Sequence, residues 1–277
     1  MERSPTASHP TTRRLGSTAT PWLVLASLPM LVFLLVPILA TLLRVNPTEI
    51  GANLANEEVR QAIWLSLTTT ATSTLLGLTL GTPLAYLLAR RRFRGRSVLD
   101  TLVDLPMVLP PSVAGIALLL AFGRRGILGQ WIDEAGLSIA FTTTAVVLAQ
   151  TFVAAPFYIK TAIAGFEGVD RELEQAAAVD GASPRQVFTH ITVPLCWPML
   201  LGGLVMSWAR ALGEFGATII FAGNFPGRTQ TMPLAIYIGF ELDLGLALTL
   251  SIILLAISYL VLFLVKQLLQ QRVTVPR

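Results

Sequence analysis

The chain has 277 residues, of which 53% are hydrophobic and 13% charged, and this composition is too apolar for a soluble domain of its size. A net charge of +4 would favour a nucleic-acid partner in a soluble protein, but here arginine-rich cytoplasmic loops explain it, and no nucleic acid is expected to bind. The single cysteine, Cys196, excludes an internal disulfide and a metal cluster built on cysteines.

The chain is predicted not to be an enzyme and to hold no cofactor of its own. Its only lysines are Lys160 and Lys266, and the glycine-rich phosphate loop that ends in lysine followed by serine or threonine is absent. The two histidines, His9 and His190, do not stand at a spacing typical of metal ligands. No metal site is expected.

Two membrane spans are predicted in the first third of the chain. Residues 1–20 are rich in serine, threonine and proline and should form a flexible cytoplasmic tail. Residues 21–43 form a first transmembrane anchor helix, which is too long for the core of a signal peptide and is expected to be retained. An outside loop over 44–58 leads to the second span, 59–89. Its hydroxyl residues either line a polar path or bond to their own helix backbone: Thr68, Thr69, Thr70, Thr72, Ser73 and Thr74.

A third span is predicted over residues 98–122, after a loop that five arginines place in the cytoplasm. The prolines between residues 106 and 111 prevent a regular helix, so this segment should face the protein interior. Asp100 and Asp104 lie one helical turn apart near its start. Asp104 is a candidate for the translocation path or gate, and the alternative is an interfacial ion pair with the arginines: Arg90, Arg91, Arg92, Arg94 and Arg96.

Three further spans are predicted over residues 139–163, 194–222 and 240–265, followed by a cytoplasmic C-terminal tail over 266–277. With six spans both termini lie inside, and the inside segments then hold fourteen of the twenty lysines and arginines. The outside loops hold five, and Arg210 lies in the membrane. This excess agrees with the positive-inside rule and predicts a multi-pass protein of the cell (inner) membrane, surrounded by lipid.

One long polar stretch, Glu172–Pro194, interrupts the hydrophobic second half of the chain. Asp170 is a predicted N-cap for a short helix that Gly181 ends, because glycine accepts the left-handed conformation. Ser183, Pro184 and Gln186 then start a second helix with a capping box, and this helix is predicted to end at Val193 and Pro194. The result is a helix–turn–helix outside the bilayer.

The spacing of Ala176-Ala177, Gly181 and Ile191-x-Val193-Pro194 resembles the EAA loop of the membrane subunits of ABC importers. The resemblance implies that residues 170–192 are the coupling loop that docks on a cytoplasmic ATPase, and small alanines suit such close docking. An ordinary amphipathic connector is the alternative. Gln175 stands where the family has a glutamate, with Glu174 beside it. The residues implied in coupling are Glu174, Gln175, Ala176, Ala177, Gly181, Ala182, Ser183 and Pro184.

A second motif lies in the fifth span, where Arg210 and Glu214 are four residues apart and are therefore expected on one inward helix face. This pair is either a structural ion pair or part of the translocation path. The candidates for the path are Ser207, Arg210, Glu214 and Thr218, together with Asp104. This stretch and residues 222–237 resemble the molybdate permeases, with the sulfate and thiosulfate permeases as near relatives.

The resemblance implies an all-α polytopic membrane protein with six transmembrane helices in the type I ABC importer permease fold. Its transmembrane domain is expected over residues 59–265. It further implies a second copy of the chain, two ATPase subunits that bind ATP and Mg²⁺, and an extracytoplasmic oxyanion-binding protein. The expected cargo is molybdate. The alternatives are tungstate, sulfate or thiosulfate in the same machine, and, as a different class, an ion-coupled secondary carrier, which the absence of an internal repeat disfavours.

Overall fold

A computed structural model describes residues 19–273, and every regular element in that range is a helix. The chain divides into two compact units, with the boundary after Arg44. The described part of the first unit is one apolar helix, α1 (Ala19–Arg44). The predicted tail over residues 1–20 lies outside the described residues, except for the start of this helix.

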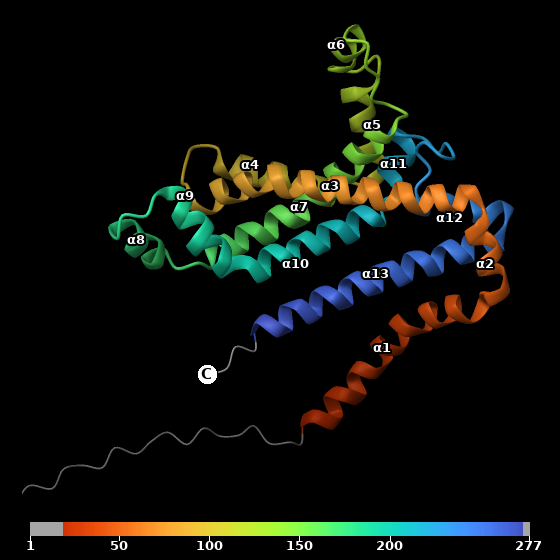
Figure 1. Ribbon diagram of the computed structural model, residues 1–277, viewed down its shortest axis with the longest axis horizontal. Coiled ribbons are helices and arrows are strands. Elements are labelled where there is room, and N and C mark those ends of the chain that lie inside the picture. The colour runs from red at the N-terminus through yellow and green to blue at the C-terminus, as the bar shows by residue number, and fades with distance from the viewer. Residues whose placement is uncertain (1–18, 274–277) are drawn as a thin grey trace, which may run out of the picture. The chain divides into compact units, whose positions relative to one another are not determined.

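The second unit begins at Val45 and contains the remaining helices (Figure 1). In chain order they are α2 (Pro47–Ala55), α3 (Glu57–Arg90), α4 (Arg96–Val108), α5 (Pro111–Phe122), α6 (Gly129–Glu134), α7 (Thr143–Glu167), α8 (Arg171–Val179), α9 (Pro184–Val187), the π-helix η1 (Phe188–Thr192), α10 (Val193–Leu212), α11 (Gly216–Phe221), α12 (Met232–Leu242) and α13 (Leu244–Val273).

Five helical stretches of the described chain are long and apolar enough to cross a bilayer, and a sixth span results if α4 and α5 are counted together. These two helices meet at an angle of 117°. Pro110 and Pro111 supply no N–H groups to a helix, and a residue before proline is driven out of helical conformation, so Leu109 is extended, with φ −64° and ψ 134°. The prediction that prolines interrupt the third span is confirmed.

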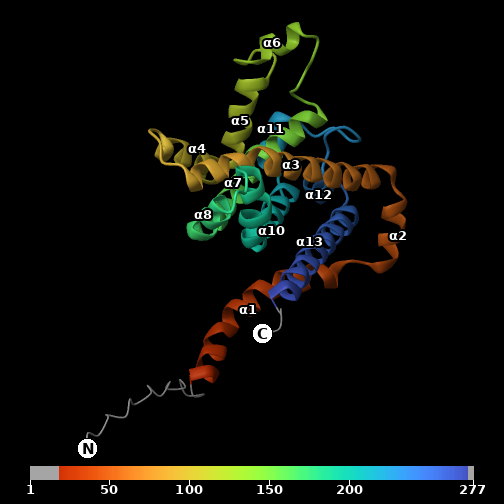
Figure 2. The same ribbon diagram turned by 60° about the vertical axis from the view of Figure 1, so that its left-hand side comes forward.

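Three long helices, α3, α7 and α10, lie side by side and enclose the largest apolar core (Figures 1 and 2). Small residues bring them together: a Cβ at Gly81 of α3 would lie 2.9 Å from Ile159 Cγ1 on α7. A Cβ at Gly165 of α7 would lie 2.9 Å from Met199 Cβ on α10. Because these glycines have no side chain, Ile159 and Met199 pack directly against the backbone of the neighbouring helix, and α7 contacts both neighbours at close range.

Most hydroxyl side chains in the first half of α3 hydrogen-bond to the backbone of their own helix. This was the second of the two alternatives that the sequence left open. Thr69 Oγ1 donates to Leu65 O at 2.8 Å, and Thr72 Oγ1 donates to Thr68 O at 2.8 Å. Ser73 is different, because its Oγ accepts a hydrogen bond from Thr151 Oγ1 on α7 at 3.1 Å. Most of this run therefore stabilises α3 and offers few free polar groups.

Two segments that the sequence predicted to be loops contain helices, and these pack against other helices of the second unit. In the predicted loop over 44–58, Asn46 caps α2, and Asn53 Nδ2 donates to Thr249 Oγ1 of α13 at 2.8 Å. After the fifth span, α12 is anchored where Met232 N donates to Ser66 Oγ of α3 at 2.7 Å, and Met232 is buried. The first segment thus joins α2 to α13, and the second joins α12 to α3.

Candidate functional site

The polar loop, defined here as residues 170–192, has the caps that its sequence predicts. Asp170 accepts a hydrogen bond from Glu172 N at 2.9 Å and so caps α8. Gly181 follows the helix with φ +90°, a conformation in which a side chain would be strained. The predicted helix start and the predicted turn are both confirmed.

The second helix of the polar loop starts with the predicted capping box. Gln186 N donates to Ser183 Oγ at 3.4 Å, and Ser183 N donates to Gln186 Oε1 at 2.8 Å. Pro184 occupies the first helical position, where its missing N–H costs nothing. Short-range hydrogen bonds therefore fix both ends of the turn between α8 and α9.

The end of that second helix differs from the prediction. The sequence placed a stop at Val193 and Pro194, but α9, η1 and α10 run on as one helical stretch from Pro184 to Leu212. In η1 the hydrogen-bond register widens, with Val193 N donating to Phe188 O. This wider turn relieves the clash between a proline ring and the carbonyl four residues earlier, so Pro194 is tolerated.

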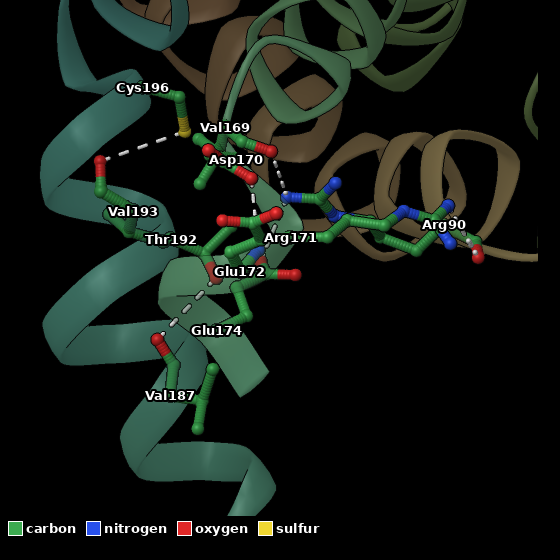
Figure 3. A network of polar contacts seen from close by, with 10 residues as sticks. All are labelled: Arg90, Val169, Asp170, Arg171, Glu172, Glu174, Val187, Thr192, Val193 and Cys196. Atoms are coloured by element: carbon green, nitrogen blue, oxygen red, sulfur yellow. Dashed lines mark hydrogen bonds and ion pairs between the residues drawn. The ribbon is translucent and has the colours of Figure 1, made fainter. Parts of the chain in front are cut away.

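A compact polar network anchors α8 to its neighbours (Figure 3). Arg90 at the end of α3 donates through Nη2 to Glu174 Oε1 at 2.9 Å and to Val169 O at 3.1 Å. Thr192 Oγ1 at the end of η1 donates to the same Glu174 Oε1 at 2.6 Å. The Arg90 and Glu174 side chains are only 8% and 15% exposed. The sequence placed Arg90 in a cytoplasmic arginine-rich loop and among the possible partners of Asp104, but it did not predict this contact with Glu174.

The surroundings of the network add to the attachment. Arg171 Nη2 donates to Arg90 O at 3.4 Å, so each arginine reaches toward the other's helix (Figure 3). Beside it, Tyr86 packs edge-on against Phe166 and Phe188, with ring centroids 5.4 and 5.0 Å away. The polar loop is thus held by charged contacts next to an aromatic cluster.

The opposite face of α8 is open. Gln175, Ala176 and Ala178 are exposed, and the apolar side chains of Leu173 and Val179 are 50% and 87% exposed. Ala177 and Ala182 are half-buried. A hollow of about 500 Å³ lies between α3 and the two short helices, and its lining includes Arg90, Arg91, Arg171, Gln175, Ala182 and Pro184. The predicted coupling residues are therefore gathered on one protruding structure.

The Arg210–Glu214 pair exists, although not on one helix as predicted. Arg210 Nη1 lies 2.7 Å from Glu214 Oε2, and the two side chains are 28% and 1% exposed. The helix α10 ends at Leu212, and Glu214 Oε1 accepts a hydrogen bond from Ala217 N at 2.8 Å. Glu214 therefore caps the short helix α11 while it neutralises Arg210. The predicted fifth span, 194–222, is broken at this point.

The other path candidates are distributed over three places. Ser207 is buried, and its Oγ would lie 3.9 Å from a Cβ at Gly77 of α3. Thr218 is buried in α11. Asp104 and Asp100 both contact Lys160 Nζ on α7, at 3.0 and 2.9 Å. The ion-pair reading of Asp104 is right in kind, but the partner is Lys160 and not an arginine of the preceding loop.

The described part of the chain contains no candidate metal centre. Within residues 19–273, no group of three or more histidine, cysteine, aspartate and glutamate side chains is arranged to hold a metal ion. The two notable clusters are the polar loop with its capped helices and the Arg210–Glu214 ion pair.

A family model described as "Binding-protein-dependent transport system inner membrane component" matches residues 77–275. The chain belongs to this family. The "Molybdenum transport system permease protein ModB" of Mycobacterium tuberculosis is 42% identical over 240 residues, 87% of this chain and 91% of the relative. The protein of the same name from Escherichia coli K12 is 44% identical over 178 residues, 64% of this chain and 78% of the relative.

Solved structures show the fold of this family. One is a chain of the bacterial alginate ABC transporter in complex with an alginate pentasaccharide-bound periplasmic protein. It has a TM-score of 0.73 at 18% identity, and the match covers 94% of this chain and 98% of that one. A chain of the inward-facing MetNI methionine ABC transporter has a TM-score of 0.60 at 18% identity, covering 77% of this chain and 95% of that one. The fold is therefore that of the type I ABC importer permeases, as the sequence predicted.

Proposed function

We propose that this chain is the transmembrane permease subunit of an ATP-driven, binding-protein-dependent importer of molybdate. It hydrolyses nothing itself, and it couples ATP hydrolysis by a partner subunit, which binds ATP and Mg²⁺, to alternating access of a central path. The observation that carries the proposal is the polar loop, which is rigidly capped, anchored on α3 and α10, and open on its outer face.

The outer face of the polar loop has the character of a docking surface. Leu173 and Val179 present apolar side chains on an otherwise polar structure, and exposed apolar patches of this kind mark contacts with other proteins. The alanines between them, at 176 and 178, allow a partner backbone to approach closely. We assign this face to the ATPase subunit.

Movement of the docked loop has a direct route into the membrane. The helical stretch from Pro184 to Leu212 joins the polar loop to the Arg210–Glu214 pair without an intervening loop. Beyond it, α11 packs on α5 so closely that a Cβ at Gly115 would lie 2.9 Å from Ala217 O. Spans three to five are thus mechanically connected, and we assign the path or its gate to the vicinity of Ser207, Arg210, Glu214 and Thr218, with Asp104 nearer the polar loop.

The proposed assembly contains two copies of this chain, two ATPase subunits and an extracytoplasmic oxyanion-binding protein. Both termini lie in the cytoplasm and the polar loop faces the ATPase, as the distribution of lysine and arginine favours. The proposed transmembrane domain covers residues 59–265. Its last helix, α13, continues as far as Val273, into the segment that we assign to the cytoplasmic tail.

Molybdate is proposed as the cargo because of the identity to proteins named as molybdenum transport permeases. Glu214 cancels most of the field of Arg210, so the described pair does not by itself distinguish molybdate from tungstate or sulfate. Selection is assigned to the binding protein.

The test is ATPase activity in proteoliposomes that contain this chain and its ATPase. The binding protein is added empty or loaded with molybdate, tungstate or sulfate. Stimulation by the molybdate-loaded form supports the proposal. Stimulation by sulfate alone assigns another cargo to the same machine. Uptake that follows an ion gradient, without an ATPase that co-purifies, overturns it.

Orientation is tested separately by cysteine labelling, which the single cysteine makes simple. Cys196 is buried, so Cys196→Ala gives a cysteine-free background. In that background, Val179→Cys on the polar loop and Trp131→Cys on α6 introduce exposed thiols, because the native side chains are 87% and 74% exposed. We expect a membrane-impermeant reagent to label position 131 in intact spheroplasts and position 179 only in inverted vesicles. The reverse pattern contradicts the proposed topology.

A further inference from the structure

We propose that Arg90 and Thr192 are positioning residues that clamp α8 to α3 and α10 through a single oxygen of Glu174, so that the polar loop and two membrane spans move as one body. This inference rests on the proposed function and deepens it. It concerns how a movement of the bound partner is transmitted from the docking surface to the membrane helices.

The clamp joins three helices at one atom. Glu174 Oε1 accepts hydrogen bonds from Arg90 Nη2 at 2.9 Å and from Thr192 Oγ1 at 2.6 Å (Figure 3). Arg90 is the last residue of α3, and Thr192 is the last residue of η1, directly before α10. The charged donor and the hydroxyl donor thus fix Glu174 from two different elements.

Without these contacts, α8 has little to hold it. No residue of α8 is buried, so burial of apolar surface does not attach this helix to the membrane helices. Among its apolar side chains, Leu173 and Val179 are exposed and Ala177 is only half-buried. The Glu174 contacts are therefore the main side-chain attachment of the docking helix.

The Arg90–Glu174 pair is sheltered in a way that the surface pairs are not. Its side chains are 8% and 15% exposed, whereas those of Arg60 and Glu57 are 60% and 63% exposed. Water and salt weaken exposed pairs to a small contribution, but a sheltered, hydrogen-bonded pair holds its geometry. Thr192 is fully buried, so its hydroxyl is committed to this network.

The tests use conservative variants, each with a matched control. Glu174→Gln removes the charge and keeps the shape, and Glu172→Gln makes the same change at an exposed site on the same helix. Thr192→Val removes the buried hydroxyl, and Thr192→Ser keeps it. Thr189→Val is the control, because it removes a hydroxyl at an exposed site in the same π-helix.

Each variant is reconstituted with the ATPase and the loaded binding protein. Three quantities are measured: co-purification of the ATPase, stimulation of its activity by the loaded binding protein, and anion imported per ATP hydrolysed. For Glu174→Gln and Thr192→Val we expect normal co-purification and a fall of about tenfold in anion imported per ATP, within the range of coupling between contacting residues. The two losses should be less than additive when combined, and Thr192→Ser, which keeps the hydroxyl donor to Glu174, should keep most of the wild-type ratio.

Two results overturn the clamp. One is that Glu174→Gln and Thr192→Val match their controls in anion imported per ATP. The other is that both variants lose the ATPase and unfold earlier, which gives the network a folding role only. Failure of the proposed function looks different: the wild-type chain itself then neither binds the ATPase nor responds to the loaded binding protein, and the clamp falls with it.

Discussion

The close approach of α7 and α10 predicts a large difference between two neighbouring glycine substitutions. A Cβ at Gly203 would lie 2.8 Å from Thr161 Cβ and 3.3 Å from Tyr158 O, both on α7. A Cβ at Gly202 would have no atom within 4 Å. Both substitutions to alanine gain about the same 0.5–1 kcal/mol from reduced backbone freedom, so this gain cancels in the comparison. The difference between them reports packing alone.

The expected magnitude follows from what can move. Thr161 Cβ and Tyr158 O are fixed by the α7 backbone, so Gly203→Ala must push the helices apart, and overpacking of this kind costs about 1–3 kcal/mol. We therefore expect Gly203→Ala to unfold roughly 2–12 °C below Gly202→Ala, at about 2–4 °C for each kcal/mol.

Unfolding can be followed in detergent with a thiol-reactive dye, because the single cysteine, Cys196, is 3% exposed in the apolar core that α3, α7 and α10 enclose. The dye reacts when that core opens. Equal unfolding temperatures for Gly203→Ala and Gly202→Ala, or a higher one for Gly203→Ala, would refute the argument that backbone contact holds α7 and α10 together.

Two further predictions concern α3 and the polar loop. Ser66→Ala leaves the buried N–H of Met232 without its acceptor and should cost about 1–3 kcal/mol, whereas Thr72→Val, whose hydroxyl bonds only to its own helix, should stay within about 0.5 kcal/mol; equal dye-reaction temperatures would contradict this. Ala176→Arg and Gly181→Arg should abolish uptake in proteoliposomes while the chain stays folded in detergent, because each places a bulky charge at an exposed position of the polar loop that we propose to dock. Normal uptake by both variants would show that this surface does not dock.

Short-range signals were sufficient for the polar loop. The caps at Asp170 and Ser183 and the turn at Gly181 depend on residues two or three positions away, so the sequence states them directly. The break near Pro110 was predictable for the same reason, since a proline acts on its immediate neighbours. The family resemblance rested on the spacing of Ala176-Ala177, Gly181 and Ile191-x-Val193-Pro194 in the same loop, and the comparisons confirm the family.

Long-range contacts could not be read in the same way. Arg90 is 84 residues from Glu174, and nothing in its neighbourhood distinguishes it from the adjacent arginines. The N–H of Met232 finds its acceptor 166 residues away, so its segment looked like an outside loop. The end of α10 was misplaced because the four-residue spacing of Arg210 and Glu214 is typical of a continuous helix, and the competing bond from Ala217 N was not visible.

The π-helix between the polar loop and α10 fixes the angular orientation of one relative to the other. A π-turn holds one residue more than an α-turn, and each residue of an α-helix turns the chain by about 100°. Deleting one residue between Phe188 and Thr192 would let the stretch close into a uniform α-helix. Because the π-turn absorbs its extra residue within about one turn, this deletion would leave α8 and its apolar face pointing in nearly the same direction. Closing the turn as an α-helix with all of its residues kept would instead rotate them by about 100° around the axis of α10. Whether these residues close as a π-turn or as an α-turn therefore determines the direction in which the loop points.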